Sequence, residues 1–256
     1  MLAKKYNIDN STTDYKNILD DDEIDTVIIA TRHNTHAKLI LESLSADKNI
    51  FVEKPLALNS TELNQIISAL KDSPKKQLMV GFNRRFSPHT VGIKKSIGED
   101  TGPINIIANM NAGFIDKNHW VNDLKIGGGR IIGEACHLID ICNYLTGSLV
   151  ESVYANSIGT GTDIMSESMS ITLSYVDGSN AVINYFSNGS KKYSKERIEV
   201  YSNQKTWILD NYIKTTGYGV KNFKNLKSRI NKGHQIQFKK FIESIKKGNG
   251  PLISLE

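Results

Sequence analysis

The fold of this chain is decided by residues 26–81, which read TVIIATRHNTHAKLILESLSADKNIFVEKPLALNSTELNQIISALKDSPKKQLMVG. Three short apolar runs, residues 26–31, 49–52 and 77–81, are typical of buried strands. The apolar positions between them have the spacing of amphipathic helices, with Ala37, Ile40, Leu41 and Leu44 in the first segment and Leu63, Ile66, Ile67 and Leu70 in the second. This alternation of strands and helices predicts right-handed crossovers and a parallel sheet.

The ends of these elements are also marked in the sequence. Asn59 followed by Glu62 predicts a capping box at the start of the second helix, and Pro74 predicts its end. Ligands bind beyond the carboxyl ends of the strands in sheets of this kind. The loops at that edge are residues 32–36, 53–55 and 83–85.

After Pro88 the pattern changes to a series of strands, several of which alternate in polarity. The predicted strands are residues 104–110, 150–156, 169–175, 180–186, 197–201 and 206–209, with turns at 176–179 and 202–204. Helices are predicted from about residue 133 to 145 and from 234 to 247, with Phe238, Phe241, Ile242 and Ile245 on one face of the latter. The sequence therefore predicts an α/β protein whose second part is a mostly antiparallel sheet.

Composition narrows the class of protein. The chain has 256 residues, 39% of them hydrophobic, which is enough for two unequal lobes. No apolar run is long enough to span a bilayer and no secretory signal is visible, so we expect a soluble, cytoplasmic protein without a membrane partner. The two cysteines, Cys136 and Cys142, fit neither a disulfide framework nor a zinc site.

The formal charge of +5 is unevenly distributed. Between Lys205 and Lys247 there are eleven Lys or Arg residues, against only Asp210 and Glu243. A solvated surface is the more common meaning of such a segment, and we favour it over a functional patch. If the patch binds a ligand, an anionic sugar nucleotide fits better than nucleic acid, because neither a recognition motif nor an aromatic platform accompanies the charge.

Two segments contain residues that are able to perform chemistry. Lys54 ends a predicted strand at the ligand-facing edge, where a lysine is able to hold a substrate hydroxyl, although most such lysines are surface charges. The triplet 127–129 is all glycine, which lets a ligand or another chain segment approach closely. Glu134, His137 and Asp140 share a helix face beyond it, so His137 is either a general base oriented by carboxylates or a half-buried packing residue.

Other polar and aromatic residues are weaker candidates. His33 and His36 have no third ligand at a suitable spacing, so no metal site is predicted. Arg85 is either a group that binds a carboxylate or phosphate, or a surface charge. Trp120 either stacks on a sugar ring or fills the core.

Five segments taken together resemble one known family. IDTVIIATRHNTH, NIFVEKPLA, LMVGFNRRFSP, HWVNDLKIGGG and GEACHLID occur in the order found in the glucose-fructose oxidoreductase, inositol dehydrogenase and rhizopine-catabolism (Gfo/Idh/MocA) family. The resemblance implies a Rossmann domain over residues 1–84 and an α/β domain over residues 85–256. It further implies NAD or NADP as cofactor and a homo-oligomer formed through the open sheet.

The resemblance also implies roles for individual residues. Lys54 and His137 match the family's catalytic lysine and histidine, and they would handle the hydroxyl proton while a hydride passes between a sugar carbinol and the nicotinamide. Thr31, Asn34 and His36 would line the nicotinamide ribose, with Glu53 beside the cofactor. Arg85, Trp120 and His234 would contact the substrate.

The sequence departs from the family pattern in two places. Gly133 stands where many members have an aspartate, which leaves Glu134 as the nearest carboxylate for a rearranged proton relay. This variant is similar to one in two-module oxidoreductases of surface-polysaccharide synthesis, which favours a sugar or nucleotide-sugar substrate. The second departure is that no strand is followed by G-x-G-x-x-G, and the nearest match, residues 159–161, lacks the third glycine.

The missing phosphate loop suggests that the chain starts inside the Rossmann domain, with on the order of 40 residues absent upstream. An incomplete sheet leaves an unpaired edge, so the isolated chain is expected to aggregate. The alternative hypothesis is a non-catalytic fragment or a regulatory scaffold on the same fold. The sugar and the choice between NAD and NADP do not follow from the sequence.

Overall fold

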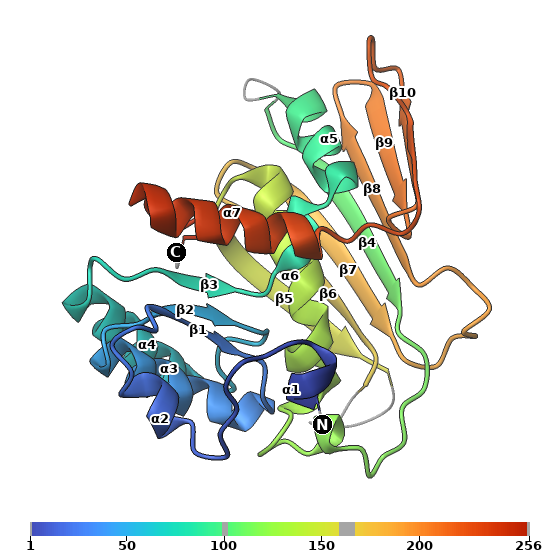
Figure 1. The fold of residues 1–256 in the computed structure, drawn as a ribbon. Helices are drawn as coiled ribbons and strands as arrows, with labels where there is room; N and C mark the ends of the chain where they lie inside the picture. The colour runs from blue at the N-terminus through green and yellow to red at the C-terminus, as the bar shows by residue number, and fades with distance from the viewer. Residues whose placement is uncertain (1, 99–101, 159–166, 255–256) are drawn as a thin grey trace.

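The computed structural model describes residues 2–98, 102–158 and 167–254, so the glycine motif at 159–161 lies outside the described residues. It contains two sheets (Figure 1). The smaller one is parallel, in the order β1 (Thr26–Ile29), β2 (Asn49–Val52) and β3 (Leu78–Val80). The predicted parallel sheet is therefore confirmed, and all three strands lie within their predicted ranges.

Helices α3 (His36–Ser45) and α4 (Ser60–Asp72) cover one face of the small sheet, while α1 (Leu2–Lys5) and α2 (Lys16–Leu19) are short and precede it. The capping interaction at the start of α4 is confirmed, because the Asn59 side chain accepts a hydrogen bond of 2.9 Å from the Glu62 amide. The prediction for Leu63 is wrong, since this side chain is 39% exposed. The strands have three or four residues, whereas a 13-residue helix is about 20 Å long, so the apolar stripe of α4 extends beyond the sheet.

The opposite face of the small sheet is covered by the last helix, α7 (His234–Lys247), as Figure 1 shows. Phe241 is buried against Phe51, with ring centroids 5.7 Å apart, and the Gln237 side chain donates a 2.9 Å hydrogen bond to the Val80 carbonyl. Phe238 touches the same Phe51 ring at 5.9 Å but is 41% exposed, so it was only partly correct to place it on the buried face. Helix α7, from the last part of the chain, thus completes the core around the small sheet, which is formed by the first part of the chain.

The second sheet has eight strands in the order β11-β10-β9-β8-β4-β7-β6-β5. Its strands are β4 (Asn105–Asn111), β5 (Val150–Ser157), β6 (Met169–Tyr175), β7 (Asn180–Phe186), β8 (Glu196–Ser202), β9 (Lys205–Asp210), β10 (Lys214–Tyr218) and β11 (Leu226–Lys227). Within this sheet, only the β4–β7 pair is parallel among the described pairings, which confirms a mostly antiparallel sheet. Strands β10 and β11 were not predicted from the sequence.

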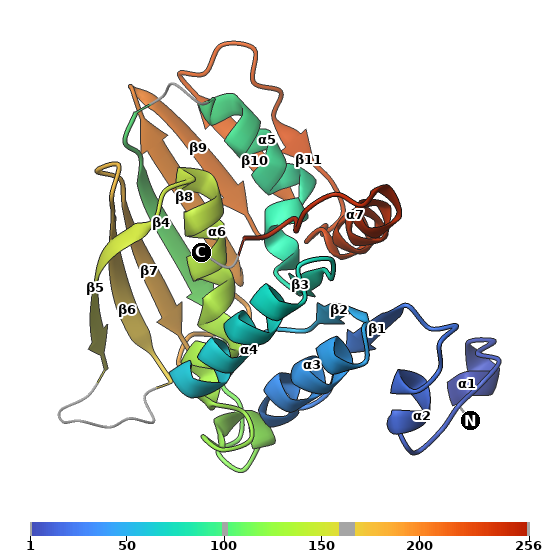
Figure 2. The same cartoon turned by 90° about the vertical axis from the view of Figure 1, so that its left-hand side faces the viewer.

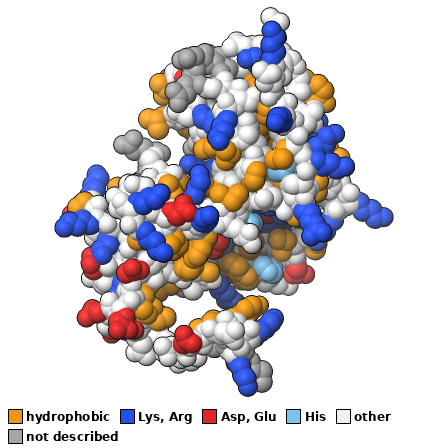
Figure 3. All heavy atoms as spheres, turned by 45° about the horizontal axis from the view of Figure 1, so that its top comes forward, with side chains coloured by type: hydrophobic (Ala, Val, Ile, Leu, Met, Phe, Trp, Pro, Cys, Tyr) orange, Lys and Arg blue, Asp and Glu red, His pale blue; other side chains and the backbone are white. Residues whose placement is uncertain are grey.

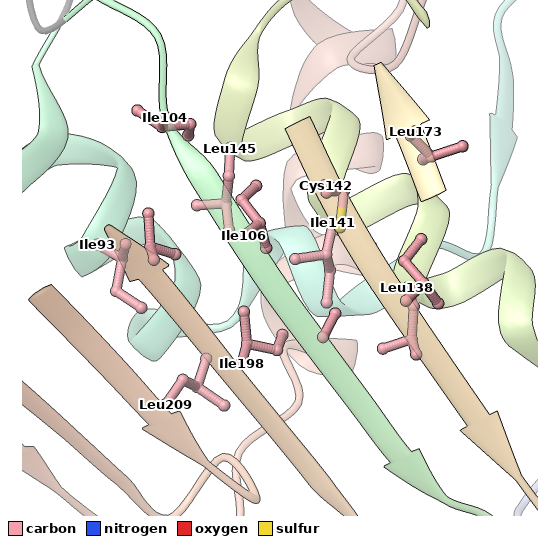
Figure 4. Close-up of a cluster of buried hydrophobic side chains, with 14 of the residues drawn as sticks. Ile93, Ile104, Ile106, Leu138, Ile141, Cys142, Leu145, Leu173, Ile198 and Leu209 are labelled. Carbon is pink, nitrogen blue, oxygen red and sulfur yellow. The ribbon is translucent and has the colours of Figure 1, made fainter. Parts of the chain in front are cut away.

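Two helices lie on one side of this sheet (Figure 2). They are α5 (Pro88–Ile97), which was not predicted although Ser87 caps it, and α6 (Cys136–Thr146), which follows a π-helical turn at Ile131–Ala135. Figure 4 shows Leu138, Ile141 and Leu145 of α6 packed toward the sheet. Because this core fixes the whole of α6, it also fixes the position of the polar residues in the first turn of the helix.

The other side of the large sheet is open and carries Ile107 and Phe186, which are 36% and 41% exposed. The edge strand β5 adds Tyr154, which lies opposite Thr172 of β6 and is mostly exposed. No helix within the described residues combines the length and the apolar character needed to cross a membrane.

Candidate active site

The first turn of α6 lies at the carboxyl edge of the small sheet. The Lys54 ammonium, directly after β2, donates a 2.6 Å hydrogen bond to the Gly133 carbonyl in the π-helical turn. His33, after β1, donates a 2.7 Å hydrogen bond from Nδ1–H to the Gly127 carbonyl. Two loops of the parallel sheet therefore hold the segment that leads into α6.

Glycine is required in this segment because the backbones approach so closely. A Cβ atom on Gly127 would lie 2.4 Å from the Val121 carbonyl oxygen, and one on Gly133 would lie 3.0 Å from the His33 ring. Gly128 and Gly129 have φ values of +73° and +80°, in the left-handed region that favours glycine. The predicted close approach is confirmed, and the approaching segment is the chain's own residue 121.

His137 occupies the first turn of α6 and is only 5% exposed. Its ring contacts the Phe82 ring edge-on, with centroids 6.0 Å apart, and its Nδ1 atom has no hydrogen-bond partner among the described residues. Burial lowers the pKa of His137 well below its ordinary value of 6.5, and the positive charges of Arg84 and Lys54 lower it further. The imidazole is therefore neutral at neutral pH, with one nitrogen able to accept a proton.

The predicted orientation of His137 by its neighbouring carboxylates is wrong. Glu134 binds the Lys195 ammonium at 2.7 Å and accepts a 2.6 Å hydrogen bond from Tyr185. Burial by itself raises the pKa of Glu134, but these two hydrogen bonds bring it down to about 2. Asp140 instead pairs with Arg85 on its other side.

The Asp140 carboxyl group is deeply buried beside Arg85. Burial raises its pKa to about 6 despite the hydrogen bond from the guanidinium. Helix spacing placed Glu134, His137 and Asp140 on one face, but each carboxylate is turned toward a cation that is distant in sequence. A proton relay from Glu134 to His137 is therefore not formed by direct hydrogen bonds.

The predicted cofactor-binding residues divide into exposed and buried groups. Thr31 and Asn34 are exposed at the carboxyl edge, and Glu53 is half-buried beside Gly81, whose Cβ position is 3.0 Å from the Glu53 carboxylate. His36 is fully buried, with Nδ1 2.8 Å from the Pro55 carbonyl oxygen and Nε2 3.2 Å from that of Thr31. The prediction that His36 lines the cofactor directly is therefore wrong. Its ring instead connects the loop after β1 with the loop after β2.

The predicted substrate contacts differ in their surroundings. Trp120 is half-buried and packs edge-on against the His33 ring, with centroids 4.8 Å apart. His234 is exposed at the start of α7; burial lowers its pKa, whereas the charge of Glu53 raises it. The Arg85 guanidinium is bound to Asp140, with a side chain only 15% exposed, so it is already engaged.

A buried charge network beside His137 was missed. Arg84 makes two hydrogen bonds to Glu196, Nε–Oε2 of 2.7 Å and Nη2–Oε1 of 2.9 Å, and Lys232 adds a third at 2.5 Å. Glu196 is 0% exposed. A signal was present, because Glu196 stands at an inward position of β8, in alternation with the buried Ile198 and Val200.

Acidification is expected to destabilise the protein partly through His137. Because the folded-state pKa lies below 6.5, the unfolded state binds more protons below that pH, and each pKa unit corresponds to about 1.4 kcal/mol. The contribution of the neutral His137 to the free energy of unfolding is fully present above pH 6.5, and it is lost as the pH falls toward the folded-state pKa of His137. Urea unfolding at about pH 7 and about pH 5 should show a smaller loss for His137→Gln than for the parent protein. An equal loss in both would contradict this prediction.

Two family models match this chain, and both describe the same family of oxidoreductases. Residues 1–82 match an oxidoreductase family with an NAD-binding Rossmann fold, GFO_IDH_MocA, and residues 103–208 match the GFO/IDH/MocA C-terminal domain. The uncharacterized oxidoreductase YrbE of Bacillus subtilis is 29% identical over 220 residues, which cover 84% of this chain and 63% of the relative. The myo-inositol 2-dehydrogenase of Thermotoga maritima is 24% identical over 271 residues, covering 100% and 79%.

Solved structures share the fold. A levoglucosan dehydrogenase in complex with NADH and levoglucosan superposes with a TM-score of 0.87 at 22% identity, covering 99% of this chain and 79% of that one. A putative myo-inositol dehydrogenase from Sinorhizobium meliloti 1021 gives a TM-score of 0.78 at 26% identity, with coverage of 99% and 80%. This chain thus spans between about three fifths and four fifths of the length of these relatives.

Proposed function

Because this chain belongs to the Gfo/Idh/MocA family of oxidoreductases, we propose that it is the catalytic part of an NAD(P)-dependent dehydrogenase that acts on a carbinol of a sugar or polyol. Relatives named inositol, levoglucosan and dihydrodiol dehydrogenases support this class of substrate. The observation that carries the proposal is the hydrogen bond from Lys54, directly after β2, to the Gly133 carbonyl, which brings the first turn of α6 with His137 to the carboxyl edge of the parallel sheet.

The residues at this edge fit the nicotinamide end of a dinucleotide. Thr31 and Asn34 offer exposed polar side chains beyond β1, and Glu53 follows β2. The buried Nδ1 of His137, which has no hydrogen-bond partner in the described part of the chain, leaves one polar atom for a ligand to satisfy. None of the three parallel strands is followed by a glycine-rich turn, so the proposal assigns no residue to the pyrophosphate.

When bound, the nicotinamide accepts or gives the hydride. The protein's own task is then to hold the substrate hydroxyl and to move its proton. The Lys54 ammonium is anchored on the Gly133 carbonyl and stabilises negative charge that develops on the hydroxyl oxygen. The neutral His137 imidazole is able to accept the proton, and the nearby positive charges oppose its retention there.

We also propose the finer features that the sequence suggested. A nucleotide sugar of surface-polysaccharide synthesis remains a candidate substrate, because the segment that carries Glu134 resembles that subgroup. A homo-oligomer through the large sheet is supported by exposed apolar side chains on its open face, among them Ile107 and Phe186.

The proposal is tested by adding NAD⁺ or NADP⁺ and a panel of myo-inositol, levoglucosan, glucose and UDP-glucose to the purified protein. We expect reduced nicotinamide to appear with at least one compound and to depend on His137, with His119→Gln, a change at an exposed loop histidine, as the control for His137→Gln. Calorimetric titration with NADH and NADPH accompanies the assay. Saturable binding without turnover of any compound would favour a non-catalytic scaffold, and absence of both would overturn the proposal for this chain.

A further inference from the structure

We propose that a lysine-lined hollow between α5 and the loop after β10 binds a small phosphorylated ligand. The lysine hollow is lined by Gly92, Lys95, Lys205, Lys221, Phe223 and Lys224, among others, and has a volume of about 620 Å³. Cavities that enclose metabolite-sized ligands have volumes in this range. Three of these lysines belong to the basic segment from residue 205 onward, of which the proposed dehydrogenase activity makes no use.

The four lysines of the hollow lack counter-charges in the described structure. None of Lys95, Lys205, Lys221 and Lys224 forms an ion pair with a described carboxylate, and no described Asp or Glu lines the hollow. Four ammonium groups around one space repel each other, and a bound phosphate relieves that repulsion while accepting charge-assisted hydrogen bonds. The chemistry of the lining therefore selects a multiply charged anion.

Glycine residues around the lysine hollow shape its backbone and leave this space open. A Cβ on Gly92 meets no atom within 4 Å, so this helical glycine of α5 faces open space in the wall of the hollow. A Cβ on Gly217 would lie 2.6 Å from the Phe223 ring, which is therefore packed directly on the backbone of β10. Gly219, at φ +68°, brings the following loop to the Gln204 carbonyl oxygen, 2.6 Å from its Cβ position.

The lysine hollow is separate from the candidate active site. Lys205 pairs with Ser202 at the end of β8, whereas Glu196, at the start of the same strand, pairs with Met110 and belongs to the charge network beside His137. Seven strand residues span roughly 20 Å. A ligand in the hollow therefore does not touch the reacting groups.

The surrounding charge supports an anionic ligand. Figure 3 shows Lys and Arg side chains spread over the upper part of the molecule, while Asp and Glu gather at the lower left. Long-range attraction of this kind raises the local concentration of anions. The hollow is open to solvent, and its volume of about 620 Å³ is the size of a site for a small molecule.

The first test is a calorimetric titration of the full chain with inorganic pyrophosphate in a phosphate-free buffer. Gly92→Glu and Gly92→Gln place side chains of equal size in the hollow, and both improve helix propensity at this position. We expect saturable binding that is at least about tenfold weaker in Gly92→Glu than in Gly92→Gln, because only the former adds a negative charge. Binding of equal affinity in the two variants would overturn the proposal.

A second pair of variants controls for net charge. Lys95→Ala/Lys205→Ala removes two lysines of the hollow, and Lys71→Ala/Lys75→Ala removes two exposed lysines on and after α4. Only the first double variant should weaken pyrophosphate binding. Absence of saturable pyrophosphate binding to the parent protein would contradict the proposed anion site. Binding that survives Gly92→Glu and is displaced by NADH would assign the anion to the dinucleotide edge instead, which separates this proposal from the proposed activity.

Discussion

Replacing Lys54 by methionine is expected to lower kcat by about 10²-fold to 10⁴-fold, the range usual for loss of a group that assists proton transfer. The Lys54 ammonium donates a hydrogen bond to the Gly133 carbonyl, four residues before His137, and its charge lowers the pKa of the His137 ring. Methionine keeps most of the side-chain volume but removes the charge and the proton. Steady-state oxidation of the best compound in the panel, at saturating cofactor, measures the effect.

Two further variants make this result specific. Lys54→Arg keeps the charge but cannot give up a proton at ordinary pH, so it is expected to restore little activity. Lys75→Met, at an exposed position after α4, is the matched control and should leave kcat unchanged. Full activity of Lys54→Met, with the melting temperature preserved, would show that Lys54 is not part of the catalytic machinery.

Replacing Arg84 by methionine is expected to destabilise the fold by about 3–5 kcal/mol, because it leaves a buried carboxylate without its main partner. Glu196 is 0% exposed and receives two of its three hydrogen bonds from the Arg84 guanidinium. Arg84 holds the pKa of Glu196 below its ordinary value although burial acts in the opposite direction. The free energy of unfolding in urea measures the loss.

The chain contains its own control for this prediction. Arg197 pairs with Glu199 at the same 2.7 Å, but these side chains are 36% and 19% exposed on the open sheet. Arg197→Met is expected to change stability by about 1 kcal/mol or less, as for other surface ion pairs. The double variant Arg84→Met/Glu196→Met should be more stable than Arg84→Met alone, because it no longer buries an unpaired charge. Equal losses for Arg84→Met and Arg197→Met would contradict the assigned role of burial.

The periodicity of the sequence was sufficient to predict most of the fold. The three parallel strands, α3, α4 and the Asn59 cap follow from spacing within a few residues, because local patterns reflect which side chains face a core. The same reasoning missed α5, β10 and β11, where Pro88 was taken as a break rather than as the first residue of a helix. It also placed Leu63 in a core that is shorter than its helix.

In the candidate site, too, the residues with a local sequence signal were predicted, whereas the contacts between distant segments were not. Lys54 and His137 were identified from their local segments and from the order of the family motifs, and the strand before Lys54 and the helix that carries His137 were predictable. Their neighbours were not. Arg84 meets Glu196 across 112 residues, His33 meets Gly127 across 94, and Glu134 turns to Lys195 across 61. A charged side chain takes whichever partner the packed sheets bring closest, and that distance is set by tertiary structure rather than by spacing along the chain.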